Sequence, residues 1–537
     1  MNAHRNGGAA VVESLAAHGV DTVFGIPGTH NLELYRHFHD AEIRAVTPRH
    51  EQGAGYAAEA YARVTGRPGV VVTTSGPGIT NAMTAAATAY AESQPVLLVS
   101  PGMPTGTEGR DLGQLHEAKN TSAAMDHLVR WSRRVRSADE AAEAVTEAFA
   151  SFHGSRPRPV HIEIPLDVLE QGWTGEVRNA PGVGVAVPDP DVTRRAAALL
   201  AAATRPLIIA GGGAVEAGHE VTALAETIGA PVATTVNGKG VVDECHPLSL
   251  GAAIRLRTLQ AEAAASDVLL VVGSELGDSD LGEGHITGGT VIRLDVEGGQ
   301  LHKNLAADVA LLADAAAGLR AVLAALPGCG SASDDGYDDG CGDGHARAAQ
   351  LRTACRAEAR ADAGGYEAVN AAVRAALPDD GVLCGDSSQV TYLGSVHFFD
   401  VPAPRRFCYT PGYATLGYGL PAGIGASLAR HGDPTAVLLG DGAFMFSVQE
   451  LATAVELRLP LPVVVVDSRG YREIRDQETR RGIAPIGVDL HVPDFLPLAE
   501  AFGAHGARTK DVGALSELVG NALDADRPTV IHLDWTE

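Results

Sequence analysis

One segment in the C-terminal third of the chain combines a carboxylate with glycines in a way that suits phosphate and metal chemistry. Residues 436–442 read Ala-Val-Leu-Leu-Gly-Asp-Gly, an apolar run that ends in a turn carrying Asp441. A carboxylate at the carboxyl end of a parallel strand, beside the start of a helix, is where α/β folds place phosphate ligands and their metal. The glycines let backbone N–H groups approach phosphate oxygens, and Asp441 can ligate Mg²⁺. Taken alone, in a chain with this much glycine, Gly-Asp-Gly is more often an ordinary turn.

A second polar loop follows at the distance that one helix and one return strand require. The apolar run 461–466 leads into Asp467-Ser-Arg-Gly-Tyr, and Ser468 lies 27 positions after Asp441. We expect a helix over residues 449–457 between the two loops. Because the carboxyl ends of parallel strands meet at one edge of a sheet, both loops should emerge side by side.

In the N-terminal part of the chain, Glu51 begins a helix-forming segment that is rich in small residues. Residues 49–63 read Arg-His-Glu-Gln-Gly-Ala-Gly-Tyr-Ala-Ala-Glu-Ala-Tyr-Ala-Arg. The glycines and alanines permit close packing against another element. A single glutamate at a helix start is ordinarily explained by its favourable interaction with the helix dipole.

The elements that must position these residues alternate along the whole chain. Short β-branched runs alternate with longer amphipathic stretches, which predicts parallel sheets with helices on both faces. A chain of 537 residues is too long for one core. We therefore predict three doubly wound α/β domains, over residues 1–172, 188–327 and 345–537. Residues 328–344, nearly all Gly, Asp, Ser and Cys, should form a flexible linker.

Composition excludes several classes of function. The formal net charge of −25 argues against nucleic acid or an anionic membrane as a partner. The longest apolar runs are the length of strands, far short of a membrane span. The first residues lack the apolar core of a secretory signal, so we expect a cytoplasmic protein. Six cysteines without Cys-x-x-Cys spacing imply neither a disulfide framework nor a zinc site.

Together the two polar segments resemble the signatures of thiamine-diphosphate-dependent enzymes of the acetolactate synthase group. The segment around Glu51 is similar, almost residue for residue, to the one whose glutamate contacts the aminopyrimidine ring of that cofactor. Gly-Asp-Gly followed at a fixed interval by Asn-Asn is the family's metal motif. The resemblance covers the whole chain. It implies a pyrimidine-binding domain, a central domain and a diphosphate-binding domain of this enzyme type, in that order. Within the group, residues 109–117, 470–475 and 486–490 most resemble the 5-guanidino-2-oxopentanoate decarboxylases.

The resemblance implies three metal ligands: the side chains of Asp441 and Ser468 and the carbonyl oxygen of Gly470. This chain has Asp467-Ser468 where the family has Asn-Asn. A serine hydroxyl is a shorter and weaker ligand than an amide oxygen, so we expect weakened affinity for Mg²⁺. The alternatives are that Asp467 supplies the charge instead, or that a water molecule fills the gap. Leu416 occupies the position of the apolar residue that bends the cofactor into its V shape. The other expected cofactor contacts are Glu51, Pro27, Gly28, Gly76, Asn81, Ser387, Gly412, Gly440, Gly442, Ala443 and Tyr471.

The substrate contacts implied by the resemblance are less specific than the cofactor contacts. Glu51 is the expected catalytic acid, and His116 stands where relatives place a Gln or His facing the reacting carbonyl. Glu473 or Glu117 could face a guanidinium tail. The remaining candidate contacts are His30, Gln114, Tyr471 and Arg475.

The predicted function is thiamine-diphosphate- and Mg²⁺-dependent decarboxylation of a 2-oxo acid, with a guanidino-type substrate and a subsequent carboligation as options. The alternatives are an acetolactate synthase-type carboligase and, from another class, a chain that lost the cofactor and serves as a binding or assembly partner. In this family the glutamate and the metal site meet across a subunit interface, so the resemblance implies a homodimer at least and usually a homotetramer. Residues 211–213 form a triple glycine that some relatives use to bind FAD. We expect a tight turn there and no bound FAD.

Overall fold

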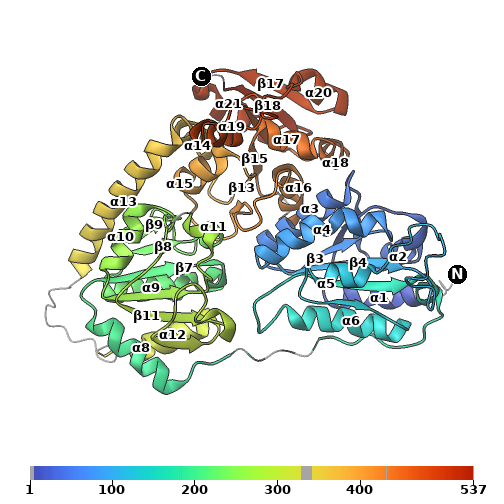
Figure 1. Cartoon of the computed structure of the whole chain (residues 1–537), viewed down its shortest axis with the longest axis horizontal. Coiled ribbons are helices and arrows are strands. Elements are labelled where there is room, and N and C mark those ends of the chain that lie inside the picture. The colour runs from blue at the N-terminus through green and yellow to red at the C-terminus, as the bar shows by residue number, and fades with distance from the viewer. Residues whose placement is uncertain are drawn as a thin grey trace.

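The protein folds into three α/β domains, which form three lobes in Figure 1. The computed structural model describes residues 5–535 except residues 181, 183, 185, 283, 328–340 and 431. Each domain contains one six-stranded parallel sheet flanked by helices, which confirms the predicted fold class.

The N-terminal domain has the strand order β2-β1-β3-β4-β6-β5. The chain runs from β1 to β2 on one side and then to β3 on the other, so the loops after β1 and β3 border the crevice where doubly wound sheets bind ligands. The strands are β1 (Thr22–Gly25), β2 (Arg44–Val46), β3 (Gly69–Val72), β4 (Val96–Gly102), β5 (Ser132–Arg134) and β6 (Val160–Pro165). The helices are α1 (Gly7–Ala17), η1 (Thr29–Asn31), α2 (Leu32–Phe38), α3 (Glu51–Thr65), α4 (Pro77–Ala91), α5 (Thr121–Asp126), α6 (Ala138–Ser151) and α7 (Leu166–Glu170).

The central domain has the strand order β12-β11-β10-β7-β8-β9, with the switch between β7 and β10. The strands are β7 (Pro206–Ala210), β8 (Val232–Thr234), β9 (Ser249–Gly251), β10 (Val268–Val272), β11 (Thr290–Asp295) and β12 (Val309–Leu312). The helices are α8 (Pro190–Ala202), η2 (Gly212–Ala217), α9 (Gly218–Ile228), η3 (Val236–Gly238), α10 (Arg257–Ala265), α11 (Asp278–Leu281), η4 (Gly298–Gln300) and α12 (Ala315–Ala325).

The triple glycine of the central domain is explained by close backbone packing. A Cβ atom at Gly213 would lie 2.8 Å from the Cα of Gly273, so the turn after β7 touches the turn after β10. Gly212 and Gly213 also line a cleft of about 830 Å³ between the N-terminal and central domains. The prediction that no FAD is bound stays a prediction.

The C-terminal domain has the strand order β14-β13-β15-β16-β18-β17. The strands are β13 (Val382–Gly385), β14 (Phe407–Cys408), β15 (Thr435–Gly440), β16 (Pro462–Asp467), β17 (His505–Thr509) and β18 (Thr529–Asp534). The helices are α13 (Cys341–Ala363), α14 (Tyr366–Ala376), η5 (Val390–Ser395, a π-helix), α15 (Val396–Phe398), α16 (Gly419–Ala429), α17 (Asp441–Ser447), α18 (Glu450–Glu456), α19 (Arg472–Arg480), α20 (Phe495–Phe502), η6 (Val512–Ala514) and α21 (Leu515–Leu523).

Two expected segments differ from the structure or lie outside it. Of the predicted linker, residues 328–344, the part up to residue 340 lies outside the described residues. The last four residues of the predicted linker instead belong to helix α13, which begins at Cys341. The helix expected over 449–457 is α18, but another helix, α17, precedes it and begins at Asp441 itself. Gly440 is extended (ψ 161°) and caps α17, so the helix follows β15 without an intervening loop.

Helix α3, which follows β2, packs so closely against the C-terminal domain that its backbone contacts the backbone of α16. Gly425 of α16 approaches Ala57 of α3 so closely that a Cβ atom would lie 2.1 Å from the carbonyl oxygen of Ala57. The strands beneath are buried on both faces, as β-branched parallel strands usually are; all six residues of β16 are buried. The small residues of the segment that begins with Glu51 therefore fix that helix to the neighbouring domain.

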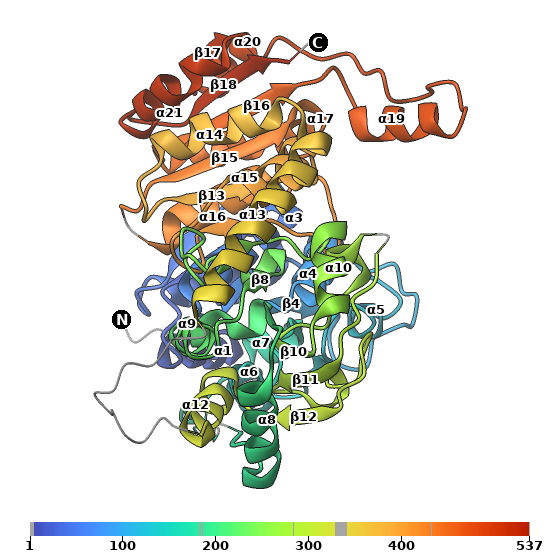
Figure 2. The same cartoon turned by 90° about the vertical axis from the view of Figure 1, so that its left-hand side faces the viewer.

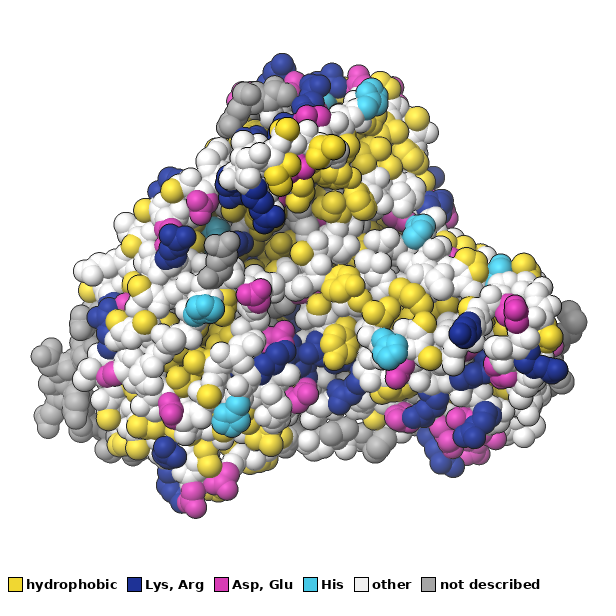
Figure 3. All heavy atoms as spheres, viewed as in Figure 1, with side chains coloured by type: hydrophobic (Ala, Val, Ile, Leu, Met, Phe, Trp, Pro, Cys, Tyr) yellow, Lys and Arg dark blue, Asp and Glu magenta, His cyan; other side chains and the backbone are white. Residues whose placement is uncertain are grey.

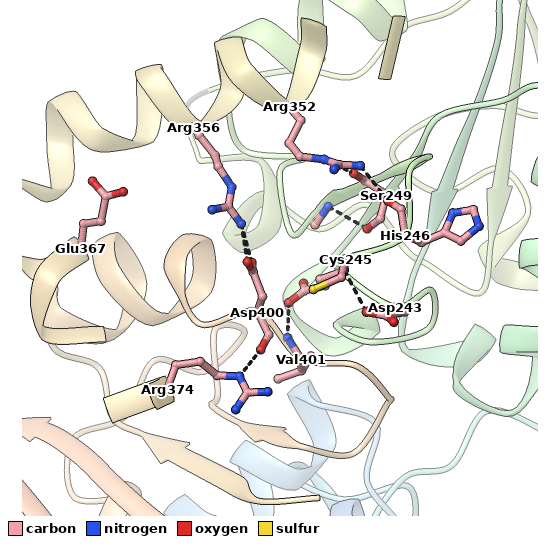
Figure 4. A network of polar contacts seen from close by, with 12 residues as sticks. Asp243, Cys245, His246, Ser249, Arg352, Arg356, Glu367, Arg374, Asp400 and Val401 are labelled. Carbon is pink, nitrogen blue, oxygen red and sulfur yellow. Dashed lines mark hydrogen bonds and ion pairs between the residues drawn. The ribbon is translucent and has the colours of Figure 1, made fainter. Parts of the chain in front are cut away.

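A polar network around Asp400 joins the central and C-terminal domains (Figure 4). Arg356 of α13 donates to the Asp400 carboxylate at 2.7 Å, and Arg374 of α14 donates to the Asp400 carbonyl oxygen at 2.9 Å. Arg352, one turn before Arg356, donates to the carbonyl oxygen of Ser249 at 2.8 Å. The long helix α13 thus fastens the central sheet to the third domain. None of the helices among the described residues is long and apolar enough to span a membrane.

Candidate functional site

The loops that carry most of the predicted cofactor contacts follow neighbouring strands of the C-terminal sheet. The chain leaves β13 for β14 on one side and then crosses to β15 on the other, so the crevice lies between β13 and β15. Residues 386–389 follow β13, residues 409–418 follow β14, and residues 468–471 follow β16. The topology therefore brings these loops together with the start of α17 at one sheet edge.

Asp441 faces the loop after β16, as the spacing of the two motifs predicts. Its Oδ1 accepts a hydrogen bond from Ser468 N at 3.2 Å and lies 3.3 Å from Ser468 Oγ, while its Oδ2 accepts one from Gly470 N at 2.7 Å. The residue is 2% exposed. Burial raises the pKa of Asp441, although these donors lower it. A bound cation would favour the ionised carboxylate.

The oxygen atoms at this edge fit Mg²⁺. In an octahedral site with ligands at roughly 2.0–2.1 Å, adjacent oxygens lie about 3 Å apart. Asp441 Oδ1 and Ser468 Oγ are 3.3 Å apart without any change in the protein. Across the described residues, no group of three or more His, Cys, Asp and Glu side chains is arranged to hold a metal ion. A carboxylate, a hydroxyl and the carbonyl of Gly470 are a hard oxygen set of the kind that Mg²⁺ prefers.

Asp467 has a different environment from Ser468. Its Oδ2 lies 3.0 Å from His532 Nε2 on β18, and its Oδ1 accepts a hydrogen bond from Arg469 N at 3.0 Å. Both oxygens of Asp467 are therefore engaged, and this residue ties β16 to β18. The side-chain oxygen beside Asp441 is the hydroxyl of Ser468.

Gly470 shapes the chain where it leaves the metal loop. Its φ is +126°, and a Cβ atom would lie 2.1 Å from the carbonyl oxygen of Val488. Tyr471 N donates to that same oxygen at 3.0 Å. Beyond this point α19 lies on an arm that extends from the body of the domain (Figure 2). Within the arm Arg475 pairs with Asp489, so its guanidinium group is engaged there.

Leu416 is half-buried in a loop that a buried carboxylate anchors. Asp386, the residue after β13, accepts hydrogen bonds from Gly417 N at 3.2 Å and from Gly419 N at 2.7 Å. Burial raises the pKa of Asp386 to about 7. On the other side, Thr415 Oγ1 lies 2.7 Å from the hydroxyl of Tyr56 on α3. Asp386 was not predicted from sequence, although it ends an apolar run as Asp441 does.

The other predicted contacts of the C-terminal domain lie along the same edge. Ser387 N donates to Asp386 Oδ1 at 2.8 Å, and Gly440 N donates to Ser388 Oγ at 3.0 Å. Ser388, which was not predicted, thereby ties the loop after β13 to the end of β15. Gly412 N donates to Glu92 Oε1 at 2.7 Å.

The first turn of α17 is tightly covered. Gly442 and Ala443 are buried there, and a Cβ atom at Gly442 would lie 2.9 Å from the ring of Tyr471. The ring of Tyr471 also lies edge-on to that of Phe446, with centroids 6.5 Å apart. Tyr471 thus packs over the start of the helix that carries Asp441.

Glu51 is the first residue of α3 and is 8% exposed. His50 caps the helix through a 3.1 Å hydrogen bond from Gln52 N to its Nδ1. Asn81 of α4, predicted as a cofactor contact, donates from Nδ2 to Glu51 Oε2 at 2.9 Å. A Cβ atom at Gly78 would lie 3.5 Å from Glu51 Oε1. Glu51 is therefore held in one orientation at the edge of the N-terminal sheet.

Two predicted histidines meet through a serine that the sequence did not single out. His30 Nδ1 lies 2.6 Å from Ser75 Oγ, which lies 3.4 Å from His116 Nδ1. Burial lowers the pKa of His30, and the nearby His116 lowers it further. Gln114 lies in the same loop as His116, but its side chain accepts a hydrogen bond from Thr107 at 3.1 Å.

The predicted glycines of the N-terminal domain lie in the two loops that border its crevice. Gly28 follows β1, and its N donates to Asn31 Oδ1 at 2.8 Å, while Pro27 beside it is exposed. Gly76 follows β3 with φ +56°, and a Cβ atom there would lie 2.5 Å from the carbonyl oxygen of His116. Glycine at this position lets the loop of His116 lie directly over the end of β3.

Family models match all three domains. The model described as "Thiamine pyrophosphate enzyme, N-terminal TPP binding domain" matches residues 5–126. The corresponding central-domain model matches residues 193–322, and the C-terminal TPP binding domain matches residues 388–533.

Relatives with assigned names align over nearly the whole chain. A probable 2-ketoarginine decarboxylase of Pseudomonas aeruginosa is 40% identical over 98% of this chain and 93% of its own length. The large subunit of acetolactate synthase isozyme 2 of Escherichia coli K12 is 32% identical over 99% of this chain and 96% of its own length. A probable acetolactate synthase large subunit of Methanocaldococcus jannaschii is 31% identical over 98% of this chain and 91% of its own length.

Proposed function

The chain belongs to the thiamine pyrophosphate enzyme family, and from this premise we propose that it is a Mg²⁺-dependent decarboxylase of a 2-oxo acid with a guanidino-type side chain. The observation that carries the proposal is the meeting of Asp441 with Ser468 and Gly470 beside the switch point of the C-terminal sheet. The name of the relative at 40% identity supports the substrate class.

When bound, thiamine diphosphate supplies a carbon nucleophile and an electron sink for the loss of carbon dioxide. In our proposal Asp441, Ser468 and the Gly470 carbonyl would hold the Mg²⁺ that offsets the charge of the diphosphate. Glu51, whose carboxyl group Asn81 fixes, would hold the aminopyrimidine ring by a hydrogen bond and supply the group that moves a proton there. Both carboxylates are buried, which strengthens such interactions.

The remaining residues orient the reactants. Asp386 fixes the loop of Leu416, on which the cofactor would rest. The chain His30–Ser75–His116 presents imidazole groups that can donate to the oxygen of the reacting carbonyl. The hydrogen bond between Ser75 and each histidine limits how far either ring can turn.

We also propose that the active unit is a dimer, in which Glu51 of one copy serves the metal site of the other. Large apolar side chains are exposed beside the cofactor loops: Phe446 is 52% exposed, Tyr413 48% and Met445 42%. Hydrophobic side chains gather over this part of the C-terminal domain (Figure 3). Exposed apolar patches of this kind mark protein–protein contacts, and a second copy would cover them.

Replacing Phe446 with Glu should break this dimer, because it would bury a charge without a partner. We expect the dimer dissociation constant to rise at least about 100-fold, with loss of activity at micromolar protein. Light scattering coupled to size-exclusion chromatography measures the mass. Leu312→Glu is the control, since Leu312 is 49% exposed on β12 of the central domain. An F446E variant that remains a fully active dimer would contradict the proposed interface.

Replacing Ser468 with Asn should tighten Mg²⁺ binding, since an amide oxygen reaches further and is a stronger ligand than a hydroxyl. We expect the Mg²⁺ concentration for half-maximal activity to fall about five- to tenfold. The measurement is a Mg²⁺ titration of the two proteins at saturating cofactor. Saturation of the unaltered protein at low micromolar Mg²⁺, or no change in S468N, would show that Ser468 does not weaken the site.

A calorimetric titration tests the cofactor assignment independently of the substrate. Thiamine diphosphate with Mg²⁺ should bind, and thiamine diphosphate with EDTA should bind much more weakly. The second candidate, an acetolactate synthase-type carboligase, is favoured by the relatives at 31% and 32% identity. Product analysis separates the two, because a decarboxylase releases an aldehyde and the carboligase joins it to a second oxo acid.

A further inference from the structure

Glu473 lies in the first turn of α19, three residues after Gly470 of the metal loop, and it bridges to the segment that follows β13. Its Oε2 accepts hydrogen bonds from Tyr392 Oη at 2.7 Å and from Gln389 Nε2 at 2.9 Å. Gln389 directly follows Ser388, whose hydroxyl is bonded to Gly440 beside Asp441. Glu473 thus lies between two of the loops that border the proposed cofactor crevice.

Asp476, one turn further along α19, joins the same cluster. The amide of Gln389 also donates to Asp476 Oδ2 at 3.0 Å, so one neutral side chain holds two carboxylates. Glu473 forms an ion pair with Arg480, which lies 3.6 Å from Oε1 and has a side chain that is 68% exposed. An exposed ion pair of this length compensates little of the charge. The hydrogen bonds from Tyr392 and Gln389 to the two carboxylates thus come from neutral side chains, at the edge of the crevice.

We infer that Glu473 and Asp476 are specificity-determining residues that bind the cationic end of the substrate; this inference rests on the proposed function. A guanidinium group has five N–H donors in a planar fork and pairs best with carboxylates. The hydrogen bonds from Tyr392 and Gln389 fix the carboxylates before the substrate arrives. Each carboxylate oxygen has further lone pairs with which to accept from a guanidinium.

The structure distinguishes Glu473 from the other acid that the sequence suggested. Both oxygens of Glu117 accept hydrogen bonds within its own loop, from Leu112 N at 3.1 Å and from Gln114 N at 3.0 Å. That carboxylate caps a turn. Glu473 instead connects two segments of the cofactor edge, and a second carboxylate lies beside it.

The test compares 5-guanidino-2-oxopentanoate with its neutral isostere, 2-oxo-5-ureidopentanoate. In Glu473→Gln and Asp476→Asn we expect the ratio of the two kcat/KM values to fall about 10- to 100-fold, with the larger loss in E473Q, because a charge-assisted pair is replaced by a neutral contact. The control is Glu517→Gln, an exposed acid on α21 of the same domain, which should leave the ratio unchanged. Equal losses for both substrates would overturn the inference and assign Glu473 to holding α19 in place.

A binding measurement separates this inference from the proposed function. The unreactive analogue 5-guanidinopentanoate is titrated into the protein with thiamine diphosphate and Mg²⁺, and hexanoate, which has the carboxylate but no cationic tail, serves as its comparison. We expect E473Q to weaken binding of the guanidino compound at least about tenfold relative to hexanoate. Selective binding without any turnover would refute the proposed function and leave the inference standing. Equal binding of both compounds by the unaltered protein would overturn the inference even if turnover is found.

Discussion

Replacing Glu51 with Gln is expected to lower kcat for decarboxylation by about 100- to 10,000-fold, the range for loss of a positioned general acid. The amide keeps the size of the side chain and can still accept the hydrogen bond from Asn81. It cannot give up a proton to the aminopyrimidine ring. Cofactor affinity should therefore change little while turnover collapses.

The measurements for E51Q are the rate of carbon dioxide release and the affinity for thiamine diphosphate by calorimetry. Exchange of the thiazolium C2 proton in deuterated buffer gives a readout that needs no substrate, and it should slow in parallel with kcat. The control is Glu147→Gln, an acid on α6 that pairs with Arg133 at the surface of the same domain. If E51Q kept more than about a third of the turnover, Glu51 would not be the catalytic acid of this account.

Replacing Asp441 with Asn should lower the affinity for thiamine diphosphate at least about 100-fold at millimolar Mg²⁺, since it removes the only carboxylate among the three proposed metal ligands. Asparagine has the same shape and can still accept from Gly470 N, so the fold should persist. A neutral amide cannot offset the charge of Mg²⁺ in this buried position.

Thermal unfolding checks the D441N prediction without an activity assay. A ligand at 100 times its dissociation constant stabilises a protein by about 2.7 kcal/mol, so thiamine diphosphate with Mg²⁺ should raise the Tm of the unaltered protein clearly and that of D441N much less. Asp167→Asn, a change at an exposed residue of α7 in the N-terminal domain, should respond like the unaltered protein. A full Tm increase in D441N would show that the cofactor is held without this ligand.

The fold and the centre of the site could be predicted because both follow from local patterns. Apolar, β-branched runs specified parallel strands, and the carboxyl ends of adjacent parallel strands share one edge. The interval of 27 residues between Asp441 and Ser468 is long enough for the intervening helices and β16, so these residues meet at 3.2 Å. The small residues after Glu51 likewise anticipated a close approach, which Gly425 of α16 provides.

The residues that sequence reasoning missed depend on strand order. Asp386 reaches the site only because β13 lies beside β15, and its partners Gly417 and Gly419 are more than 30 positions away in the chain. Ser75 links His30 and His116 across 45 and 41 positions, and no local pattern indicates that contact. Helix α17 starts at Asp441 because Gly440 is extended. The Gly-Asp-Gly run alone does not specify that backbone conformation.

The structure shows which contacts Asp467 and Ser468 make in place of the family's Asn-Asn. Asp467 is directed to His532 of the neighbouring strand, so the change at this position alters the support of the loop. Ser468 leaves a hydroxyl beside Asp441, and a hydroxyl still fits an oxygen-liganded cation. The geometry thus favours a functional site of reduced metal affinity over a chain that has lost its cofactor.

The most direct test of the central claim is carbon dioxide release from 5-guanidino-2-oxopentanoate by the purified protein, with thiamine diphosphate and Mg²⁺ present or each omitted. We predict turnover that requires both additions, with kcat/KM at least about tenfold higher than for pyruvate. Absence of turnover with every 2-oxo acid at saturating cofactor, or turnover that is independent of thiamine diphosphate, would contradict it.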